Sequence, residues 1–196
     1  MNNRFLETIK SIDGKPFHIP YHQWRYEKVL NSLGIIDPPN LEDYIAPPND
    51  GLYRCRVVYT KDSIDVNYFK YNKRHIKTLK LIESNSIEYS FKYEDRKELD
   101  LLYNKRESCD DILIVKNSYI TDTSIANVAL YKNGEWVTPK SPLLKGTTRQ
   151  RLLDEGKIIE KDILVDDVFS YTKIALLNAM IDFDIIRHEN IREIVC

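Results

Sequence analysis

Hydroxyl and guanidinium groups gather at one predicted helix start late in the chain. Gly146 is followed by Thr147, Thr148 and Arg149, and helical spacing continues to about Glu155. The first N–H groups of a helix have no partner within it, and the helix dipole attracts anions to this end. Two hydroxyls and a guanidinium add donors that suit a phosphate. The alternative is ordinary capping by Thr147, with Arg149 as a surface charge.

Arg25 is a second candidate for binding an anion, in the segment His22-Gln-Trp-Arg25 at the start of another predicted helix. Its planar fork of donors matches the oxygens of a phosphate, so it could hold one in a fixed orientation. It could equally be a charge on the outer face of an amphipathic helix. We expect His22 to be a structural histidine rather than a catalytic one.

A lysine and an aspartate complete the residues with chemical potential. Lys92 lies between Phe91 and Tyr93, and a lysine that loses solvation beside aromatic rings becomes a better nucleophile. The chain has many lysines, however, and the sequence pattern alone does not single this one out. Asp122 lies between two strand-like segments, where its carboxylate could pair with a cationic ring nitrogen or close an Asx-turn.

The composition is typical of a globular protein, with 42% apolar and 30% charged residues among 196. The 29 basic and 30 acidic side chains leave a formal net charge of −1, which argues against a nucleic-acid-binding protein. The sequence has no Gly-rich phosphate loop, nucleophile elbow or metal-ligand spacing. We therefore expect neither a nucleic-acid partner nor a metal.

Signals for location are sparse. The sequence has no apolar run of membrane-spanning length and no signal-peptide pattern after Met1, so we expect no association with a membrane. The cysteines Cys55, Cys109 and Cys196 are odd in number and lack metal spacing. We expect them to be free thiols in a reducing cytoplasm.

Periodicity and turn signals predict an α+β chain made mostly of sheet. Asp13-Gly14 and Asn133-Gly134 are strong hairpin signals. A change of pattern near residues 84–91 predicts two lobes, a small N-terminal α/β lobe over 1–88 and a larger β-rich lobe over 89–196. The expected helices cover 21–33, 41–45, 99–106 and 147–155, with a short helix or turn over 162–167 and a short last element over 191–195. The expected strands cover 5–10, 16–19, 52–60, 63–71, 78–83, 87–91, 111–116, 119–121, 126–131, 136–138, 171–177 and 180–186.

In order along the chain, six segments resemble those of the class IV aminotransferases, the fold-type IV pyridoxal-phosphate enzymes. These segments are Phe5-Leu-Glu7-Thr8 before Asp13-Gly14, His22-Gln-Trp-Arg25, Lys92-Tyr-Glu-Asp-Arg96, Ile120-Thr-Asp122-Thr-Ser-Ile-Ala-Asn127, Leu144-Lys-Gly146-Thr147-Thr148-Arg149 and Leu177-Asn178-Ala179-Met180. They are similar to the family's F-E-T hairpin, H-x-x-R, K-x-x-x-R, T-E-x-x-x-x-N, L-x-G-I-T-R and N-A-L/M segments. No single segment is specific, but the ordered set covers most of the chain.

The resemblance implies a role for each matching residue. Lys92 would carry the cofactor as a Schiff base and then move a proton at the substrate carbon. Asp122 would keep the pyridine nitrogen protonated, so that the ring acts as an electron sink. The residues implied to bind the cofactor are Arg25, Lys92, Asp122, Asn127, Thr147, Thr148 and Asn178. Weaker candidates for binding substrate are Thr8, Arg54 and Arg56.

The resemblance also implies a fold and partners. The expected fold is a short version of the two-lobed, D-amino-acid-aminotransferase-like type, in which the larger lobe carries most of the cofactor site. The expected partners are a small-molecule amino substrate and a second copy of the chain in a homodimer.

Three departures from the family pattern bear on the substrate. The chain is shorter than typical members, lacks the G-D-G before F-E-T, and has Asp122 where many members have Glu. The compact chain most resembles the 4-amino-4-deoxychorismate lyases, which release 4-aminobenzoate and pyruvate for folate synthesis. The alternatives are an amino-acid transaminase of the branched-chain or D-amino acid type and a non-catalytic, sheet-rich binding protein.

Overall fold

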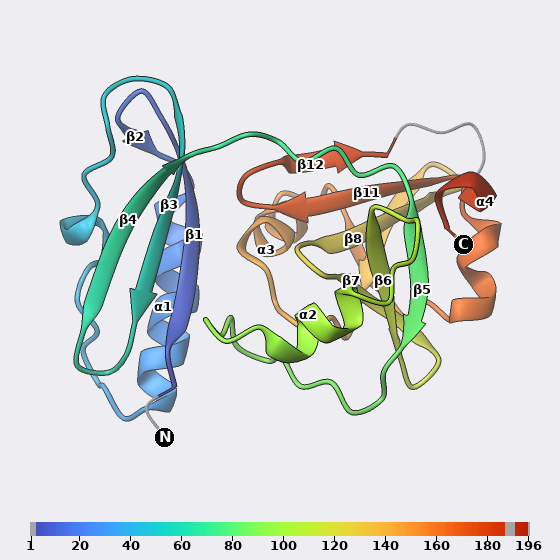
Figure 1. The fold of residues 1–196 in the computed structure, drawn as a ribbon, viewed down its shortest axis with the longest axis horizontal. Helices are drawn as coiled ribbons and strands as arrows, with labels where there is room; N and C mark the ends of the chain where they lie inside the picture. The colour runs from blue at the N-terminus through green and yellow to red at the C-terminus, as the bar shows by residue number, and fades with distance from the viewer. Residues whose placement is uncertain (1–2, 187–190, 196) are drawn as a thin grey trace. The chain divides into compact units, whose positions relative to one another are not determined.

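The computed structural model describes residues 3–186 and 191–195. Contacts divide the chain into two compact units. Unit 1 contains the residues up to Lys73 together with Phe91–Asp95, and unit 2 contains Arg74–Ser90 together with the residues from Arg96 onward (Figure 1). This division differs from a single boundary between residues 88 and 89, because residues 74–90 belong with unit 2 while the short segment 91–95 returns to unit 1.

Unit 1 is a four-stranded antiparallel sheet with one long helix (Figure 1). Its strands follow the order β2-β1-β3-β4. The elements are β1 (Phe5–Ile12), β2 (Lys15–Pro16), α1 (Ile19–Ser32), the 3-10 helix η1 (Leu41–Tyr44), β3 (Leu52–Tyr59) and β4 (Ile64–Lys70). The hairpin signal at Asp13-Gly14 is confirmed, since both residues have positive φ, 48° and 77°. The strand expected over 16–19 ends at Pro16, because His18 adopts a left-handed conformation and Ile19 begins α1.

The two faces of the unit 1 sheet carry different residues. Phe5 and Ile9 of β1 pack in one core with Val29 and Leu30 of α1 and with Val57 of β3. Directly opposed residues of an antiparallel pair lie on one face, and side chains alternate along a strand. Because Glu7 is opposite Val57, it lies on the face that packs against α1, whereas Thr8 and Arg56, which oppose each other, lie on the other face.

The segment Phe91–Asp95 adds to the edge of the unit 1 sheet. The N–H of Leu6 donates to the carbonyl of Lys92 at 2.8 Å, and Phe5 bridges Tyr93. The rings of Phe91 and Tyr93 both pack against Phe5, so the segment is fixed on each side of Lys92. The strand expected over 87–91 is wrong, since these residues form no ladder.

Unit 2 is built on one eight-stranded sheet in the order β10-β9-β8-β7-β6-β5, from which β11 pairs with β8 and β12 (Figure 1). The strands are β5 (Leu79–Glu83), β6 (Asp111–Lys116), β7 (Tyr119–Thr123), β8 (Asn127–Lys132), β9 (Glu135–Pro139), β10 (Ile159–Lys161), β11 (Lys173–Asn178) and β12 (Asp182–Ile185). The helices are α2 (Lys97–Tyr103), α3 (Thr147–Asp154), the 3-10 helix η2 (Val165–Ser170) and α4 (Ile191–Ile194).

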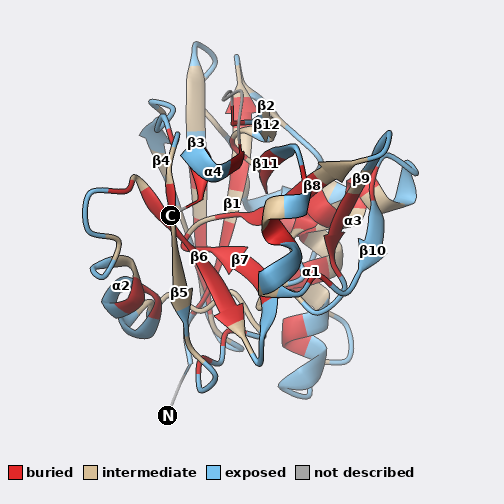
Figure 2. Ribbon diagram, turned by 90° about the vertical axis from the view of Figure 1, so that its right-hand side faces the viewer, coloured by how far each residue is buried: buried red, intermediate tan, exposed pale blue. Residues whose placement is uncertain are grey.

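The core of unit 2 lies mainly in its strands, several of which are buried along most of their length (Figure 2). Strand β6 matches its predicted bounds because Ile112, Leu113 and Ile114 form an unbroken apolar run, as expected for a strand covered on both faces. Strand β10 is unpredicted, because its three residues are all exposed and give no apolar pattern. Within the described ranges, the helices are too short or too polar to cross a membrane.

Candidate active site

In unit 1, a buried carboxylate gathers two side chains of α1. Arg25 donates to Glu7 twice, from Nε to Oε1 at 2.7 Å and from Nη2 to Oε2 at 2.6 Å. His22 Nδ1 lies 2.7 Å from Oε2 of the same carboxylate. All three side chains are buried, and Glu7 is 0% exposed. The cluster forms because His22 and Arg25, three residues apart, share the helix face that packs on β1.

The electrostatics of this cluster define its protonation. Burial alone would raise the pKa of Glu7, but the charge of Arg25 and the hydrogen bonds from His22 and Arg25 outweigh it and lower the pKa to about 2. Burial lowers the pKa of His22, although Glu7 acts in the opposite direction. At neutral pH the cluster therefore holds a carboxylate, a guanidinium and a neutral imidazole, whose Nδ1–H donates to Glu7.

Lys92 belongs to the same unit as this cluster. Its side chain is half-buried, and its backbone forms a tight turn in which Tyr93 N–H donates to Phe91 O at 2.9 Å. The positive charge of Lys92 contributes to lowering the pKa of His22, after burial and the charge of Arg25. Unit 1 thus brings Lys92 within electrostatic range of the His22, Glu7 and Arg25 cluster.

Tyr59 adds an unsatisfied donor to the surroundings of this cluster. Its ring is 1% exposed and lies 4.8 Å, centroid to centroid, from that of Tyr26. Burial and the charge of Glu7 raise the pKa of Tyr59, so the phenol stays protonated. Its hydroxyl has no hydrogen-bond partner in the described part of the chain. Buried hydroxyls are normally paired, so this one is an exception among the described residues.

In unit 2, Asp122 and Asn127 oppose each other across the β7–β8 hairpin. Thr123 closes the turn between them: its N–H donates to Ala126 O, and its Oγ1 accepts from the N–H of Ala126 at 3.0 Å. The spacing of five residues between the acid and the amide is therefore the length of one tight hairpin turn. The turn fixes the two side chains side by side.

Asp122 is held by donors to both of its oxygens. Asn127 Nδ2 donates to Oδ1 at 2.7 Å, and the N–H of Leu144 donates to Oδ2 at 2.9 Å. Burial raises the pKa of Asp122 to about 6, against these hydrogen bonds and the charge of Arg149, which lower it. A buried carboxylate with a raised pKa favours a cationic partner, such as a protonated ring nitrogen.

The helix start at Gly146 is joined to the same group of residues. Asn127 Nδ2 also donates to Leu144 O at 2.7 Å, and a Cβ on Gly146 would stand 2.0 Å from Asn127 Oδ1. Gly146 is the N-cap of α3 and supplies no side-chain cap, so the alternative of capping by Thr147 is not found. Thr147 and Thr148 are buried in the first turn, whose N–H groups keep their capacity for an anion.

Arg149 is neither a surface charge nor a donor at the helix start. It is 1% exposed, and its Nη2 donates to Pro139 O at 2.8 Å and to Glu160 Oε1 at 2.6 Å. Arg149 therefore fixes α3 against the ends of β9 and β10. Its positive charge lowers the pKa of Asp122 through space, without direct contact between the two side chains.

The remaining predicted site residues have contacts of other kinds. Asn178 Oδ1 accepts from the N–H groups of Met180 and Ile181, which shapes the turn between β11 and β12. Arg54 stacks on Phe69, and Arg56 pairs with Glu94 at 2.7 Å. Thr8, Arg54 and Arg56 lie on the sheet face opposite Glu7, so their proposed role toward substrate stays a prediction.

Sequence reasoning missed Glu7 and Leu144 as contributors to the site. The signal for Glu7 is an acid inside an apolar strand, since burial of such a carboxylate requires a cationic partner. Leu144 acts through its backbone, which sequence does not reveal.

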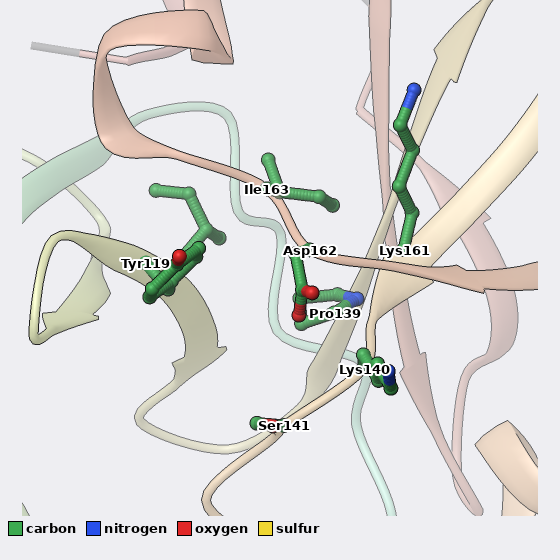
Figure 3. A pocket seen from close by; sticks show the side chains of 8 residues that line it. Tyr119, Pro139, Lys140, Ser141, Lys161, Asp162 and Ile163 are labelled. Atoms are coloured by element: carbon green, nitrogen blue, oxygen red, sulfur yellow. The ribbon is translucent and has the colours of Figure 1, made fainter.

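A separate pocket of about 280 Å³ lies on unit 2, where the ends of β9 and β10 meet β7 (Figure 3). Its lining residues are Tyr119, Ile120, Pro139, Lys140, Ser141, Lys161, Asp162 and Ile163. The positively charged Lys140 and Lys161 and the carboxylate of Asp162 all line this pocket, so its charges do not indicate one class of ligand. None of the predicted site residues lines it. Over the described ranges, the side chains form no cluster of metal ligands.

The chain is 37% identical over 181 residues to an uncharacterised protein of Haemophilus influenzae, which covers 89% of this chain and 96% of that protein. It is 35% identical, with a TM-score of 0.86, to the crystal structure of a candidate 4-amino-4-deoxychorismate lyase from Haemophilus somnus 129pt, over 92% of this chain and 97% of that one.

More distant structures share the fold. The pyridoxal-phosphate-bound form of a hypothetical aminotransferase from Mycobacterium tuberculosis has a TM-score of 0.76 at 16% identity, over 94% of this chain and 80% of that one. The family described as amino-transferase class IV matches residues 4–187. These residues include the Glu7–Arg25 cluster, Lys92, the Asp122–Asn127 hairpin and the start of α3, so the chain belongs to the class IV aminotransferase family.

Proposed function

We propose that this protein is a 4-amino-4-deoxychorismate lyase, which releases 4-aminobenzoate and pyruvate. Membership of the family makes the chain a pyridoxal-phosphate-dependent enzyme, and the proposal concerns its reaction. The observation that supports it is the 35% identity to the Haemophilus somnus protein, which extends over 97% of that chain.

The described residues fit the phosphate and the ring of the cofactor. The start of α3 offers N–H groups without a side-chain cap, beside the hydroxyl-bearing Thr147 and Thr148. Gly146 has no room for a Cβ, so a glycine here lets Asn127 keep its place beside the start of α3. In unit 1, Arg25 is the donor that the family resemblance assigns to the phosphate. We assign the phosphate to Thr147, Thr148 and Arg25.

The chain's own residues then have distinct tasks in the reaction. Pyridoxal phosphate, when bound, would supply an electron sink for the bond that breaks at the substrate carbon. Asp122 would keep a proton on the ring nitrogen, with Asn127 holding its carboxylate in place. Nζ of Lys92 would hold the cofactor and then, as a free amine, move the proton at the substrate carbon. Asn178 shapes the turn that lines the cofactor, and Thr8, Arg54 or Arg56 binds a substrate carboxylate.

The biological setting is part of the same proposal. 4-Aminobenzoate is a building block of folate, so the enzyme would serve folate synthesis. We also propose that it acts as a homodimer, as the family resemblance implies. Size-exclusion chromatography with light scattering gives twice the 23.1 kDa chain mass if the dimer forms, and the single chain mass rejects it.

The reaction is tested with purified protein, pyridoxal phosphate and 4-amino-4-deoxychorismate. The proposal predicts equal amounts of 4-aminobenzoate and pyruvate, and no transfer of the amino group to an added keto acid. Lys92→Ala must abolish product release. Amino transfer from an amino acid to a keto acid, without either product from aminodeoxychorismate, would reject the lyase in favour of a transaminase.

A further inference from the structure

The family resemblance gives no role to Glu7, which contacts both Arg25 and His22 in the unit 1 cluster. Its carboxylate meets the guanidinium of Arg25 through two parallel hydrogen bonds, at 2.7 and 2.6 Å. A fork held at two nitrogens cannot rotate about its own axis, whereas a single contact would leave it free to turn. The plane of the Arg25 guanidinium is therefore set by Glu7.

The geometry also limits which side of Arg25 can face an anion. The edge formed by Nε and Nη2 is engaged by Glu7, so a phosphate cannot approach Arg25 from that edge. His22 supports the arrangement, because its Nδ1 lies 2.7 Å from Oε2 and holds the carboxylate from a second direction. Burial of all three side chains excludes water from these contacts, so each donor has one available orientation.

The charges of the cluster are a second reason why the orientation of the Arg25 guanidinium affects phosphate binding. The low pKa of Glu7 keeps it ionised, and the lowered pKa of His22 keeps the imidazole neutral. Carboxylate and guanidinium together carry no net charge, so the cluster attracts a phosphate by the direction of its N–H groups more than by charge. Misalignment of Arg25 would then remove most of its contribution.

We propose that Glu7 is a positioning residue that fixes the Arg25 guanidinium for the phosphate, and so sets the preference of this enzyme for pyridoxal phosphate over unphosphorylated pyridoxal. The inference rests on the proposed role of Arg25 toward the cofactor. It assigns Glu7 no contact with cofactor or substrate. A purely structural carboxylate would affect folding and both forms of the cofactor alike.

The test compares affinities for the two forms of the cofactor. The full-length protein, freed of cofactor with hydroxylamine, is titrated by calorimetry with pyridoxal phosphate and with pyridoxal. The quantity compared is the dissociation constant for pyridoxal divided by that for pyridoxal phosphate. A change in this ratio between variants reports the phosphate, since every other difference between the two compounds is the same for each variant. Glu7→Gln is expected to reduce this ratio about tenfold or more, through weaker binding of pyridoxal phosphate with little change for pyridoxal.

Two further variants make the test robust. Glu7→Asp keeps the buried charge and protects folding, but the shorter side chain cannot keep both contacts with Arg25, so the ratio falls here as well. Glu94→Gln is the matched control, because Glu94 pairs with Arg4 and Arg56 of the same unit at 2.8 and 2.7 Å but touches none of the cluster. Its ratio is expected to equal that of the wild type.

The outcomes separate the two proposals. If the wild type binds pyridoxal phosphate but Glu7→Asp keeps the wild-type ratio, Glu7 does not position Arg25 and the inference is overturned. Equal losses for both forms of the cofactor also overturn it, since they indicate a structural role. A wild type that binds no pyridoxal phosphate overturns the proposed function itself, and the inference with it.

Discussion

The side-chain amide of Asn127 joins the buried carboxylate of Asp122, 2.7 Å away, to the carbonyl of Leu144, also 2.7 Å away. One amide group thus links the carboxylate that we assign to the ring nitrogen with the turn that leads to α3, the helix that we propose binds the phosphate. Its oxygen fills the space beside Gly146. Asn127 therefore holds two parts of the proposed cofactor site in unit 2 together, the carboxylate of Asp122 and the turn before α3.

Asn127→Ala is expected to destabilise the chain by about 1–3 kcal/mol, because Asp122 and Leu144 each lose a buried partner. Urea unfolding of the cofactor-free protein measures this change. Asn67→Ala is the control, since the side-chain amide of Asn67 donates at 2.7 Å to the exposed Asp65 two residues away, and loss of this bond should cost no more than about 0.5 kcal/mol. Equal losses of unfolding free energy in the two variants would show that Asn127 does not hold Asp122 and Leu144 together.

Gly146→Ala is expected to destabilise the chain, because its Cβ would lie 2.0 Å from Asn127 Oδ1 and force that side chain to move. The φ of Gly146 is −73°, so backbone strain makes no contribution. The same change in an Asn127→Ala background meets no such atom. The double variant should therefore lose less unfolding free energy than the sum of the losses of the two single variants. A loss equal to that sum would contradict the steric explanation.

The raised pKa of Asp122 predicts a pH dependence of stability. Because its pKa is about 6 in the folded chain and 3.8 in the reference state, the folded chain binds this proton more tightly. Its contribution is complete below pH 3.8 and is lost as the pH rises through 6, a change of about 3 kcal/mol. In cofactor-free protein, the difference in the free energy of unfolding between wild type and Asp122→Asn should decrease in this way as the pH rises. A flat difference from pH 4 to 7 would contradict it.

Glu7 has the opposite dependence. Its pKa is lowered from 4.5 to about 2, so its contribution is complete above pH 4.5 and is lost as the pH falls towards 2. The change is about 3 kcal/mol and needs no discount for exposure, since Glu7 is 0% exposed. Acid unfolding of the wild type should show it and that of Glu7→Gln should not. Parallel acid profiles of the two proteins would exclude an ionised Glu7.

Sequence predicted best those features that are local. The hairpin at Asp13-Gly14, strand β6 and the helix from Gly146 all depend on turn chemistry or on an unbroken apolar run, which a short window reveals. The strand expected over 87–91 failed because its apolar residues are buried individually, without a partner strand. The exposed β10 failed for the opposite reason, since its pairing with β9 leaves no trace in its composition.

The candidate site was predictable only in part. The sequence indicates Arg25, Lys92, Asp122 and Asn127 by resemblance, but their partners depend on tertiary contacts. Glu7 meets Arg25 across 18 residues, and Leu144 meets Asp122 across 22. Arg149 is the instructive case, because an arginine in a first helical turn suggests an anion ligand, whereas its partners are Pro139 and Glu160.

Borohydride reduction tests directly whether Lys92 is the residue that carries the cofactor. The protein loaded with pyridoxal phosphate is reduced with borohydride, digested and analysed by peptide mass spectrometry. We expect one pyridoxyl group, on Lys92, and none in the Lys92→Ala protein. A pyridoxyl group on another lysine of the wild type, or on none, would contradict it.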